Sequence, residues 1–280
     1  MLEIIFLLVL ALIWIIFATI QDLRTKEIAN WLNFSLIAFA LGFRFFYSLF
    51  SDNGFGFFYQ GLIGLGVFFV LGNLFYHGKM FAGGDEKLFV ALGPILPVSN
   101  NFFPNLENFF LFLLIFFLVG AVYSIITGFA LCFKHYSRFR KELKKQFKGK
   151  KKLVILATFF AVIIGLSTLF TNYFLLYLAV LIFLLPYLYL YAKAADEAIM
   201  IKIIDSKNLR EGDWLYKDIK IKGKTIRATW NGLSRKEISL LRKSKKKVLI
   251  REGVAFSPVF LISFLVFFYL WIIGLRYSFW

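Results

Sequence analysis

Residues 4–30 read IIFLLVLALIWIIFATIQDLRTKEIAN, an apolar run that ends abruptly in a charged segment. The run Ile4–Ile20 has no charged side chain, and a helix that crosses a bilayer needs about 20 mainly apolar residues. Asp22 follows it after Gln21, and a carboxylate so close to hydrocarbon is costly and usually has a function. The stretch therefore predicts a transmembrane helix with a functional carboxylate at its end.

Seven further apolar runs follow, and 60% of the 280 residues are hydrophobic. This composition, with a mean hydropathy of +0.75, excludes an ordinary soluble globular protein. We expect an all-α polytopic membrane protein with about 6–8 transmembrane helices and a small cytosolic α+β insert. The further runs are Trp31–Phe50, Phe57–Tyr76, Leu88–Val98 (which is short), Phe109–Leu131, Leu153–Phe170, Tyr173–Tyr191 and Phe256–Leu275.

The first run differs from a secretory signal peptide. Glu3 stands where a basic segment would be, and no small-residue cleavage site follows the run. We therefore expect a retained first helix. The single cysteine, Cys132, excludes a disulfide within the chain and a four-cysteine zinc site.

The net charge of +17 is distributed unevenly along the chain. If the N-terminus lies outside and the runs cross alternately, the inside segments are 21–30, 77–87, 132–152 and 192–255. These segments hold 31 of the 33 Lys and Arg residues, as the positive-inside rule requires. The charge is thus explained by topology in a multi-pass cytoplasmic membrane protein, and no nucleic-acid partner is expected.

The distribution of runs and charges predicts five parts of the chain. Residues 1–131 form a membrane catalytic unit, and 132–152 a basic cytosolic loop. Residues 153–191 form a transmembrane hairpin that turns at Thr171-Asn172, 192–255 a cytosolic α+β insert, and 256–280 a C-terminal transmembrane anchor.

Two of these parts have a finer pattern. In the basic loop, Phe139, Leu143 and Phe147 recur every four residues, which predicts a short amphipathic helix that can lie on the inner leaflet and attract anionic lipid. A solvated loop is an equal alternative. In the insert we expect a helix from Ala192 to near Ile204, a hairpin about Lys222-Gly223, a capping box from Ser234 to Glu237 that opens a helix, and a strand at Val248–Ile250.

Two aspartates form the candidate site. The runs 31–50 and 57–76 separate Asp22 from Asp85, and two crossings return the chain to the side from which it started. Both carboxyls therefore lie at one membrane face, whichever way the chain is oriented. Two carboxyls that share a proton can activate water and protonate a leaving nitrogen, which is the chemistry of metal-free peptide hydrolysis. Gly83 and Gly84 precede Asp85 and allow backbone conformations that other residues resist.

The segments Asp22-x5-Ile28-x-Asn30 and Gly83-Gly84-Asp85-x-Lys87 resemble those of the type 4 prepilin peptidase family, most closely its archaeal preflagellin and prepilin peptidases. The resemblance covers about residues 1–100. It implies a membrane aspartic peptidase with a glycine-x-glycine-aspartate motif near the cytosolic face. The substrates it implies are pilin-like or archaellin-like precursors.

Residue by residue, the resemblance implies that Asp22 and Asp85 are catalytic and that Lys87 and Asn30 support the motifs, Asn30 by capping the second helix. Ala82 and Ala29 depart from the family pattern, which has a glycine and a proline at these positions. The paired CxxC zinc motifs of bacterial members have no counterpart here, and we expect no metal and no cofactor.

Glu27 and Glu86 are candidates to bind the basic residues that precede the cut in such leaders, although a solvated loop charge explains either one equally well. Elsewhere in the membrane unit, we expect Arg44 to extend its charged group to the outer membrane surface. We expect four glycines to permit close helix contacts: Gly61, Gly64, Gly66 and Gly72.

Three other functions remain open. The first is a presenilin- or signal-peptide-peptidase-like protease, although such proteases carry a Tyr-Asp pair within a helix and here Gln21 precedes Asp22. The second is a non-enzymatic transporter that uses both aspartates, but no duplicated half is evident. The third is a basic scaffold that binds lipid or nucleic acid and is indifferent to Asp22→Asn.

Overall fold

The computed structural model describes residues 2–51, 54–168, 174–221, 224–230, 232–244 and 247–274. The chain forms two compact units. The first unit comprises residues 1–125 and 254–280, and the second comprises residues 126–253. The predicted helix-rich membrane fold with a small α+β part is confirmed.

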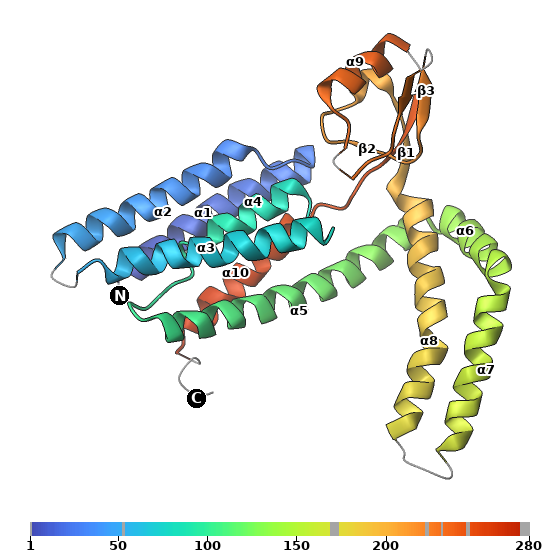
Figure 1. The fold of residues 1–280 in the computed structure, drawn as a ribbon, viewed down its shortest axis with the longest axis horizontal. Helices are drawn as coiled ribbons and strands as arrows, with labels where there is room; N and C mark the ends of the chain where they lie inside the picture. Colours follow the sequence, from blue (N-terminus) through green and yellow to red (C-terminus); the bar gives the residue numbers. More distant parts are fainter. Residues whose placement is uncertain are drawn as a thin grey trace. The chain divides into compact units, whose positions relative to one another are not determined.

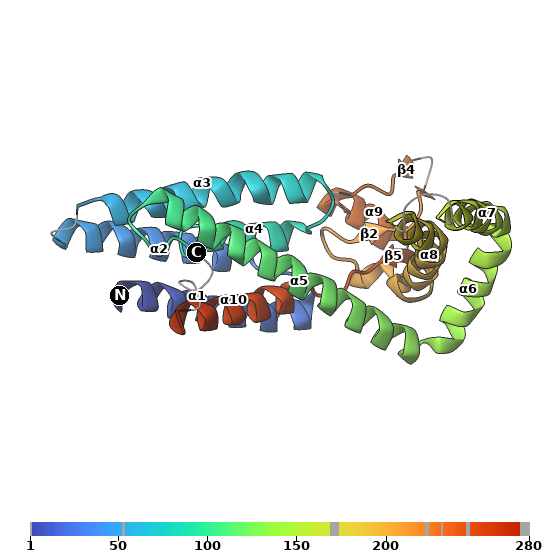
Figure 2. The ribbon, with the colours of Figure 1, turned by 90° about the horizontal axis from the view of Figure 1, so that it is seen from below.

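The first unit is a bundle of helices (Figures 1 and 2). Its elements are α1 (Leu2–Thr25), α2 (Asn30–Phe50), α3 (Gly56–His77), α4 (Gly83–Leu92), the first part of α5 (Phe102–Lys134) and α10 (Ser257–Ile272). α4 packs against α2 and α3, and α10 packs along α1 although the two helices come from opposite ends of the sequence.

Within the described residues, five helices are long and apolar enough to span a membrane: Leu2–Thr25, Asn30–Phe50, Gly56–His77, Phe102–Lys134 and Phe174–Met200. α10 is apolar but shorter, and α7 (Lys151–Ser167) has 17 described residues. α4 has only 10 residues, about 15 Å at 1.5 Å per residue, so it is not such a span.

The core of the first unit is rich in phenylalanine. Phe68, Phe89, Phe112, Phe116 and Phe260 are almost fully buried and meet in a chain of tilted and edge-to-face ring contacts. Such contacts are preferred by aromatic rings, and here they join α3, α4, α5 and α10.

The predicted run Leu88–Val98 is helical only as far as Leu92, and it continues as buried turns to Val98. Non-helical backbone at membrane depth needs protein donors for its carbonyls. Arg44 supplies them. Its guanidinium donates to the carbonyl oxygens of Pro94 (2.7 Å), Pro97 and Phe57 (2.8 Å).

The prediction that Arg44 extends to the membrane surface is therefore wrong. The side chain is fully buried, and its guanidinium carbon lies 4.1 Å from the centre of the Phe57 ring. The non-helical carbonyls and the aromatic face compensate for burying this cation, so it has no need to reach water.

Three of the four predicted contact glycines are confirmed. A Cβ at Gly61 would lie 2.5 Å from Arg44 Cδ, one at Gly72 would lie 2.8 Å from Val90 Cγ2, and one at Gly64 would collide with the Gly93 carbonyl. The prediction is wrong for Gly66, where nothing lies within 4 Å of such an atom.

The second unit begins with the last residues of α5, α6 (Tyr136–Gly149), α7 and α8 (Phe174–Ala195) (Figure 1). α7 and α8 pack as a hairpin, whose predicted turn at Thr171-Asn172 lies outside the described residues. The predicted amphipathic helix is confirmed as α6. The rings of its Phe139 and Phe147 contact Tyr191 and Tyr187 of α8.

The α+β part follows α8 and a π-helical turn, η1 (Asp196–Met200). β1 (Ile201–Asp205), β5 (Lys247–Arg251) and β2 (Trp214–Leu215) form an antiparallel sheet in the order β1-β5-β2, with Ile203 opposite Leu249. β3 (Ile219–Ile221) pairs with β4 (Lys224–Ile226). The other elements are η2 (Ser206–Asn208) and α9 (Arg235–Ser244).

The predicted helix from Ala192 to near Ile204 is wrong at its end, because β1 begins at Ile201. Pairing with β5 offers the alternating Ile residues a sheet partner, which the local pattern does not reveal. The β3–β4 pairing and the β5 strand are confirmed, while the hairpin turn Lys222-Gly223 lies outside the described residues. The capping box is also confirmed, since the Ser234 amide and hydroxyl both donate to Glu237 Oε2.

Candidate active site

Asp22 lies in the last turn of α1 and is 6% exposed. Its Oδ2 accepts a hydrogen bond of 3.2 Å from the backbone N–H of Ser257, the first residue of α10. After α1, Lys26 adopts a φ of 60°, and Gln21 Oε1 accepts the Ala29 N–H at 3.0 Å. These contacts fold the segment between α1 and α2 back over the end of α1.

Asp85 lies in the first turn of α4, three residues after the N-cap Ala82, and its side chain is half-buried. The Gly83 and Gly84 that precede it are helical and do not have positive φ, so the expected unusual backbone conformation is absent at these described residues. A Cβ at Gly84 would lie 3.5 Å from the Ile28 backbone N, so this turn of α4 passes close to the segment that follows α1.

The two predicted motifs lie side by side. Lys87 Nζ donates to Asn30 Oδ1 at 2.7 Å, which links α4 to the start of α2. Asn30 is the first residue of α2 and Ala29 is its N-cap, so the prediction that Asn30 caps this helix is wrong. Asn30 holds the Lys87 ammonium.

Asp22 and Asp85 lie within electrostatic reach of each other. Asp85 precedes the buried run and lies outside the five spanning helices. Burial raises the pKa of Asp85 to about 7, and the charge of Asp22 adds to this rise, while a hydrogen bond from the Ala82 backbone acts in the opposite direction. The Asp85 carboxyl can therefore hold a proton near neutral pH.

Glu27 lies exposed in the segment between α1 and α2, and Glu86 is half-buried next to Asp85 in α4. Both border the segments that carry the two aspartates, and their role as binders of a basic leader stays a prediction. Among the described residues, no three His, Cys, Asp or Glu side chains cluster as metal ligands do.

Two contributors to the site could not be found from the sequence. Ser257 reaches Asp22 across 235 positions. Tyr123 of α5 lies within electrostatic reach of Asp22, and its hydroxyl donates to the Ala255 carbonyl at 2.9 Å. No local motif marks either residue, since each is brought in by helix packing alone.

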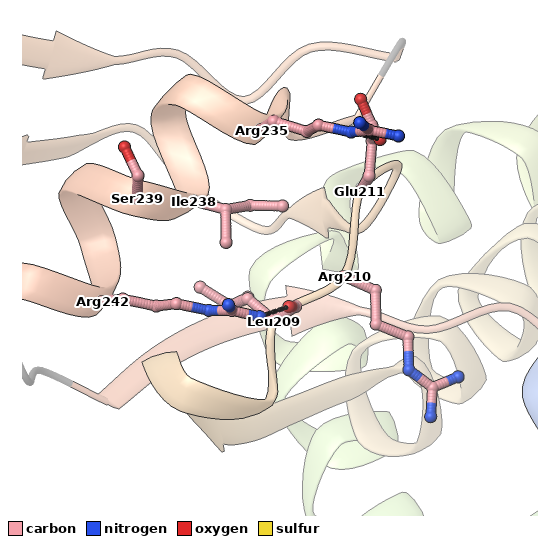
Figure 3. A pocket seen from close by; sticks show the side chains of 7 residues that line it. All are labelled: Leu209, Arg210, Glu211, Arg235, Ile238, Ser239 and Arg242. Atoms are coloured by element: carbon pink, nitrogen blue, oxygen red, sulfur yellow. Dashed lines mark hydrogen bonds and ion pairs between the residues drawn. The ribbon is translucent and has the colours of Figure 1, made fainter.

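A separate pocket lies in the α+β part of the second unit, between α9 and the segment 209–211 (Figure 3). Its arginines are engaged within the protein. Arg235 pairs with Glu211 at 2.6 Å, and Arg242 donates to the Leu209 carbonyl at 2.9 Å. None of the predicted site residues lines this pocket.

Comparison with protein families matches residues 9–125 to the type IV leader peptidase family. The matched segment includes Asp22 and Asp85 and does not reach α10. No curated protein and no solved structure matches the chain.

Proposed function

We propose that this protein is a membrane aspartic endopeptidase that removes the leader peptide from type IV pilin-like or archaellin-like precursors at the cytosolic membrane face. The similarity of residues 9–125 to the type IV leader peptidase family supports a peptidase of this general kind. The feature that supports the proposal most directly is that Asp22 and Asp85 lie within electrostatic reach of each other, and that burial raises the pKa of Asp85 to about 7.

The mechanism needs one ionised and one protonated carboxyl. The carboxylate removes a proton from a water molecule, whose oxygen adds to the carbonyl carbon of the peptide bond. The acid gives its proton to the carbonyl oxygen, and a neutral tetrahedral diol forms. The C–N bond then breaks as the first carboxyl gives its proton to the leaving nitrogen and a hydroxyl of the diol returns a proton to the second. Both carboxyls end in their starting states.

Substrate binding follows from the positions of the two aspartates. The apolar stretch of a precursor would lie in the membrane against the helices of the first unit and present its leader at the rim, beside the ends of α1 and α4. A basic leader would meet a protein face crowded with Lys and Arg. Glu27 and Glu86 border the aspartates and would offset that local repulsion.

The orientation proposed here puts the N-terminus outside and the active site in the cytosol. It is supported by the positive-inside distribution, which places 31 of the 33 Lys and Arg residues on one side. Anionic lipids of the inner leaflet are the natural partners of the basic residues of α6.

The test is to express the protein in membranes with a pilin-like or archaellin-like precursor and to follow processing by gel. Asp22→Asn and Asp85→Asn should each abolish processing while expression stays normal. The matched control is Asp205→Asn in β1, an aspartate outside the site that should process normally. Retained processing in either active-site variant would eliminate the paired-carboxyl mechanism.

A second experiment tests the substrate-binding glutamates. Glu27→Lys and Glu86→Lys should slow the cleavage of a precursor with a basic leader more than that of one with a neutral leader. Equal rates for the two precursors would remove these residues from the proposal without affecting the catalytic pair.

A further inference from the structure

The pocket between α9 and the segment 209–211 has a volume of about 450 Å³, which lies in the range of ligand-binding pockets (Figure 3). α9 contributes Arg235, Ile238 and Arg242 to its lining. These residues are three and four positions apart, so their side chains project from one face of the helix, toward the loop. The pocket is therefore formed by one helix face and one loop of the same unit.

The loop that faces α9 is held by hydrogen bonds to its backbone. The Arg210 N–H donates to Asp213 Oδ2 at 2.7 Å. The Gly212 N–H donates to the Leu233 carbonyl at 2.9 Å, and the Leu233 N–H donates to the Asp213 carbonyl at 2.9 Å. Gly212 has a φ of 91°, which glycine adopts without strain. The loop is thus bound to the residues that precede α9, so the pocket is preformed.

The middle of the pocket is apolar. Leu209 and Ile238 are almost fully buried and belong to the hydrophobic core of the α+β part. In Figure 3, Ile238 lies between two polar contacts, which are the Arg235–Glu211 ion pair and the hydrogen bond from Arg242 to the Leu209 carbonyl. The pocket therefore presents an apolar floor with a guanidinium at each end.

Both of these arginines keep most of their hydrogen-bond donors. Within the part of the chain that the structure describes, Arg235 contacts Glu211 through Nε alone, and Arg242 donates through one terminal nitrogen. A guanidinium has five N–H donors, so each arginine can bind a further carboxylate. The side chains of Arg235 and Glu211 are 87% and 55% exposed. Since an exposed ion pair stabilises little, an incoming carboxylate can replace that of Glu211.

The charge and the length of the pocket indicate the chemistry of its ligand. Arg210, Arg235 and Arg242 line it together with Glu211, and three positive charges and one negative charge give +2. Arg235 and Arg242 are separated by two turns of α9, about 10 Å at 1.5 Å per residue. A single phosphate or carboxylate would therefore leave the apolar floor uncovered. A peptide with an acidic residue on each side of an apolar one matches the floor and both arginines.

We propose that this pocket is a docking site for an acidic peptide segment of a partner protein. One carboxylate of the segment binds Arg235 in place of Glu211, a second binds Arg242, and an apolar side chain between them packs on the apolar floor. The proposal goes beyond the peptidase function, since the pocket lies in the second unit, outside the family-matched segment 9–125. Its test is a binding measurement, which does not depend on precursor cleavage.

The probe is a fluorescein-labelled peptide, Glu-Glu-Leu-Glu-Glu, titrated with the full-length protein in a zwitterionic detergent and followed by fluorescence anisotropy. Saturable binding is expected with a Kd below about 1 mM. It should weaken about tenfold for Gln-Gln-Leu-Gln-Gln, which lacks the charges, and several-fold for Glu-Glu-Ser-Glu-Glu, which lacks the apolar side chain. Binding that does not saturate, or equal affinities for the three peptides, would overturn the proposal.

Inorganic phosphate distinguishes a peptide site from a simple anion site. It can bind one guanidinium but cannot cover the apolar floor, so it should displace the labelled peptide much less well than the unlabelled peptide does at the same concentration. Equal displacement by phosphate and by the unlabelled peptide would overturn the proposal.

Variants locate the binding in the pocket. Arg235→Gln and Arg242→Gln should each weaken it about tenfold, whereas Glu211→Gln should strengthen it several-fold, because it removes the competing carboxylate. The matched controls are Arg227→Gln, an exposed arginine of the same α+β part outside the pocket, and Glu142→Gln in α6, and neither should change the affinity.

The opposite signs of these effects keep the proposal falsifiable. If controls of the same charge change alter the affinity as much as the pocket variants do, net charge alone attracts the peptide and the proposal is overturned. A weaker affinity in Glu211→Gln would overturn it as well. Should Arg242→Gln fail to fold, as judged by thermal unfolding, the exposed positions Arg235 and Glu211 still decide the outcome.

Discussion

The contact between α3 and the turn after α4 gives the sharpest mutational prediction, since Gly64→Ala should disturb the position of Asp85 from a distance. A Cβ at Gly64 would collide with the Gly93 carbonyl and lie 2.8 Å from Pro97 Cγ, against an ordinary contact of at least 3.4 Å. The Pro97 contact alone requires a retreat of about 0.6 Å, and the rigid Gly93 carbonyl requires more. The turn, and α4 with it, must therefore move by on the order of 1 Å.

A shift of this size has two measurable costs. Overpacking a well-packed core destabilises by about 1–3 kcal/mol. Displacing a catalytic group by about 1 Å can lower the rate on the order of 100-fold. We therefore expect Gly64→Ala to lower both the thermal unfolding midpoint in detergent and the initial rate of precursor cleavage in membranes, with the larger effect on the rate.

Gly66→Ala is the matched control, because it lies two positions along the same helix and nothing lies within 4 Å of the added methyl group. It should keep full activity and gain up to about 1 kcal/mol from helix propensity. If Gly64→Ala and Gly66→Ala behave alike in both assays, the reasoning from the close contact to the position of Asp85 is refuted.

Three further predictions concern protonation and two polar contacts. Because the pKa of Asp85 is raised to about 7, its carboxyl is protonated below that pH and ionised above it. A pH–rate profile should therefore show cleavage falling about tenfold per pH unit above about 7. A flat profile up to pH 9 would contradict this. Arg44→Met leaves the carbonyls of Phe57, Pro94 and Pro97 buried without that donor, so it should destabilise by about 3 kcal/mol or more in thermal unfolding, whereas the exposed Arg24→Met should change little. Lys87→Met and Asn30→Ala should each lower the free energy of unfolding by about 0.5–1.5 kcal/mol. The double variant should lose no more than the larger single effect, because both substitutions remove the same hydrogen bond. Fully additive losses would show that the two residues act separately.

The fold can be predicted from the sequence wherever the length of an apolar run determines that it forms a helix. Seven of the eight predicted apolar runs coincide with a helix over the residues that the structure describes, because the need to satisfy backbone groups in hydrocarbon leaves few alternatives. The run Leu88–Val98 is the exception. Its helix stops at Leu92 because turns between Gly93 and Val98 are satisfied by Arg44, a residue whose role depends on packing 50 positions away.

The candidate site, like the fold, can be predicted from the sequence only in part. Asp22 and Asp85 are found from their position beside apolar runs, and crossing parity puts them on one face. The contact of Asp22 with the Ser257 N–H cannot be found in this way, because the apolar flanks of Ser257, Phe256 and Pro258, carry no motif. Likewise, Asn30 looks like a helix cap in the sequence, but its acceptor oxygen is taken by Lys87 of a different helix.

The packing of α10 against α1 also has a consequence for biogenesis. Asp22 leaves the ribosome long before its partner, and at about 5–20 residues per second the 235 intervening positions take roughly 10–50 s to translate. During that interval the nascent chain carries both aspartates without the Ser257 N–H that donates to Asp22. The surroundings of Asp22 are therefore completed only after the second unit, residues 126–253, has been synthesised.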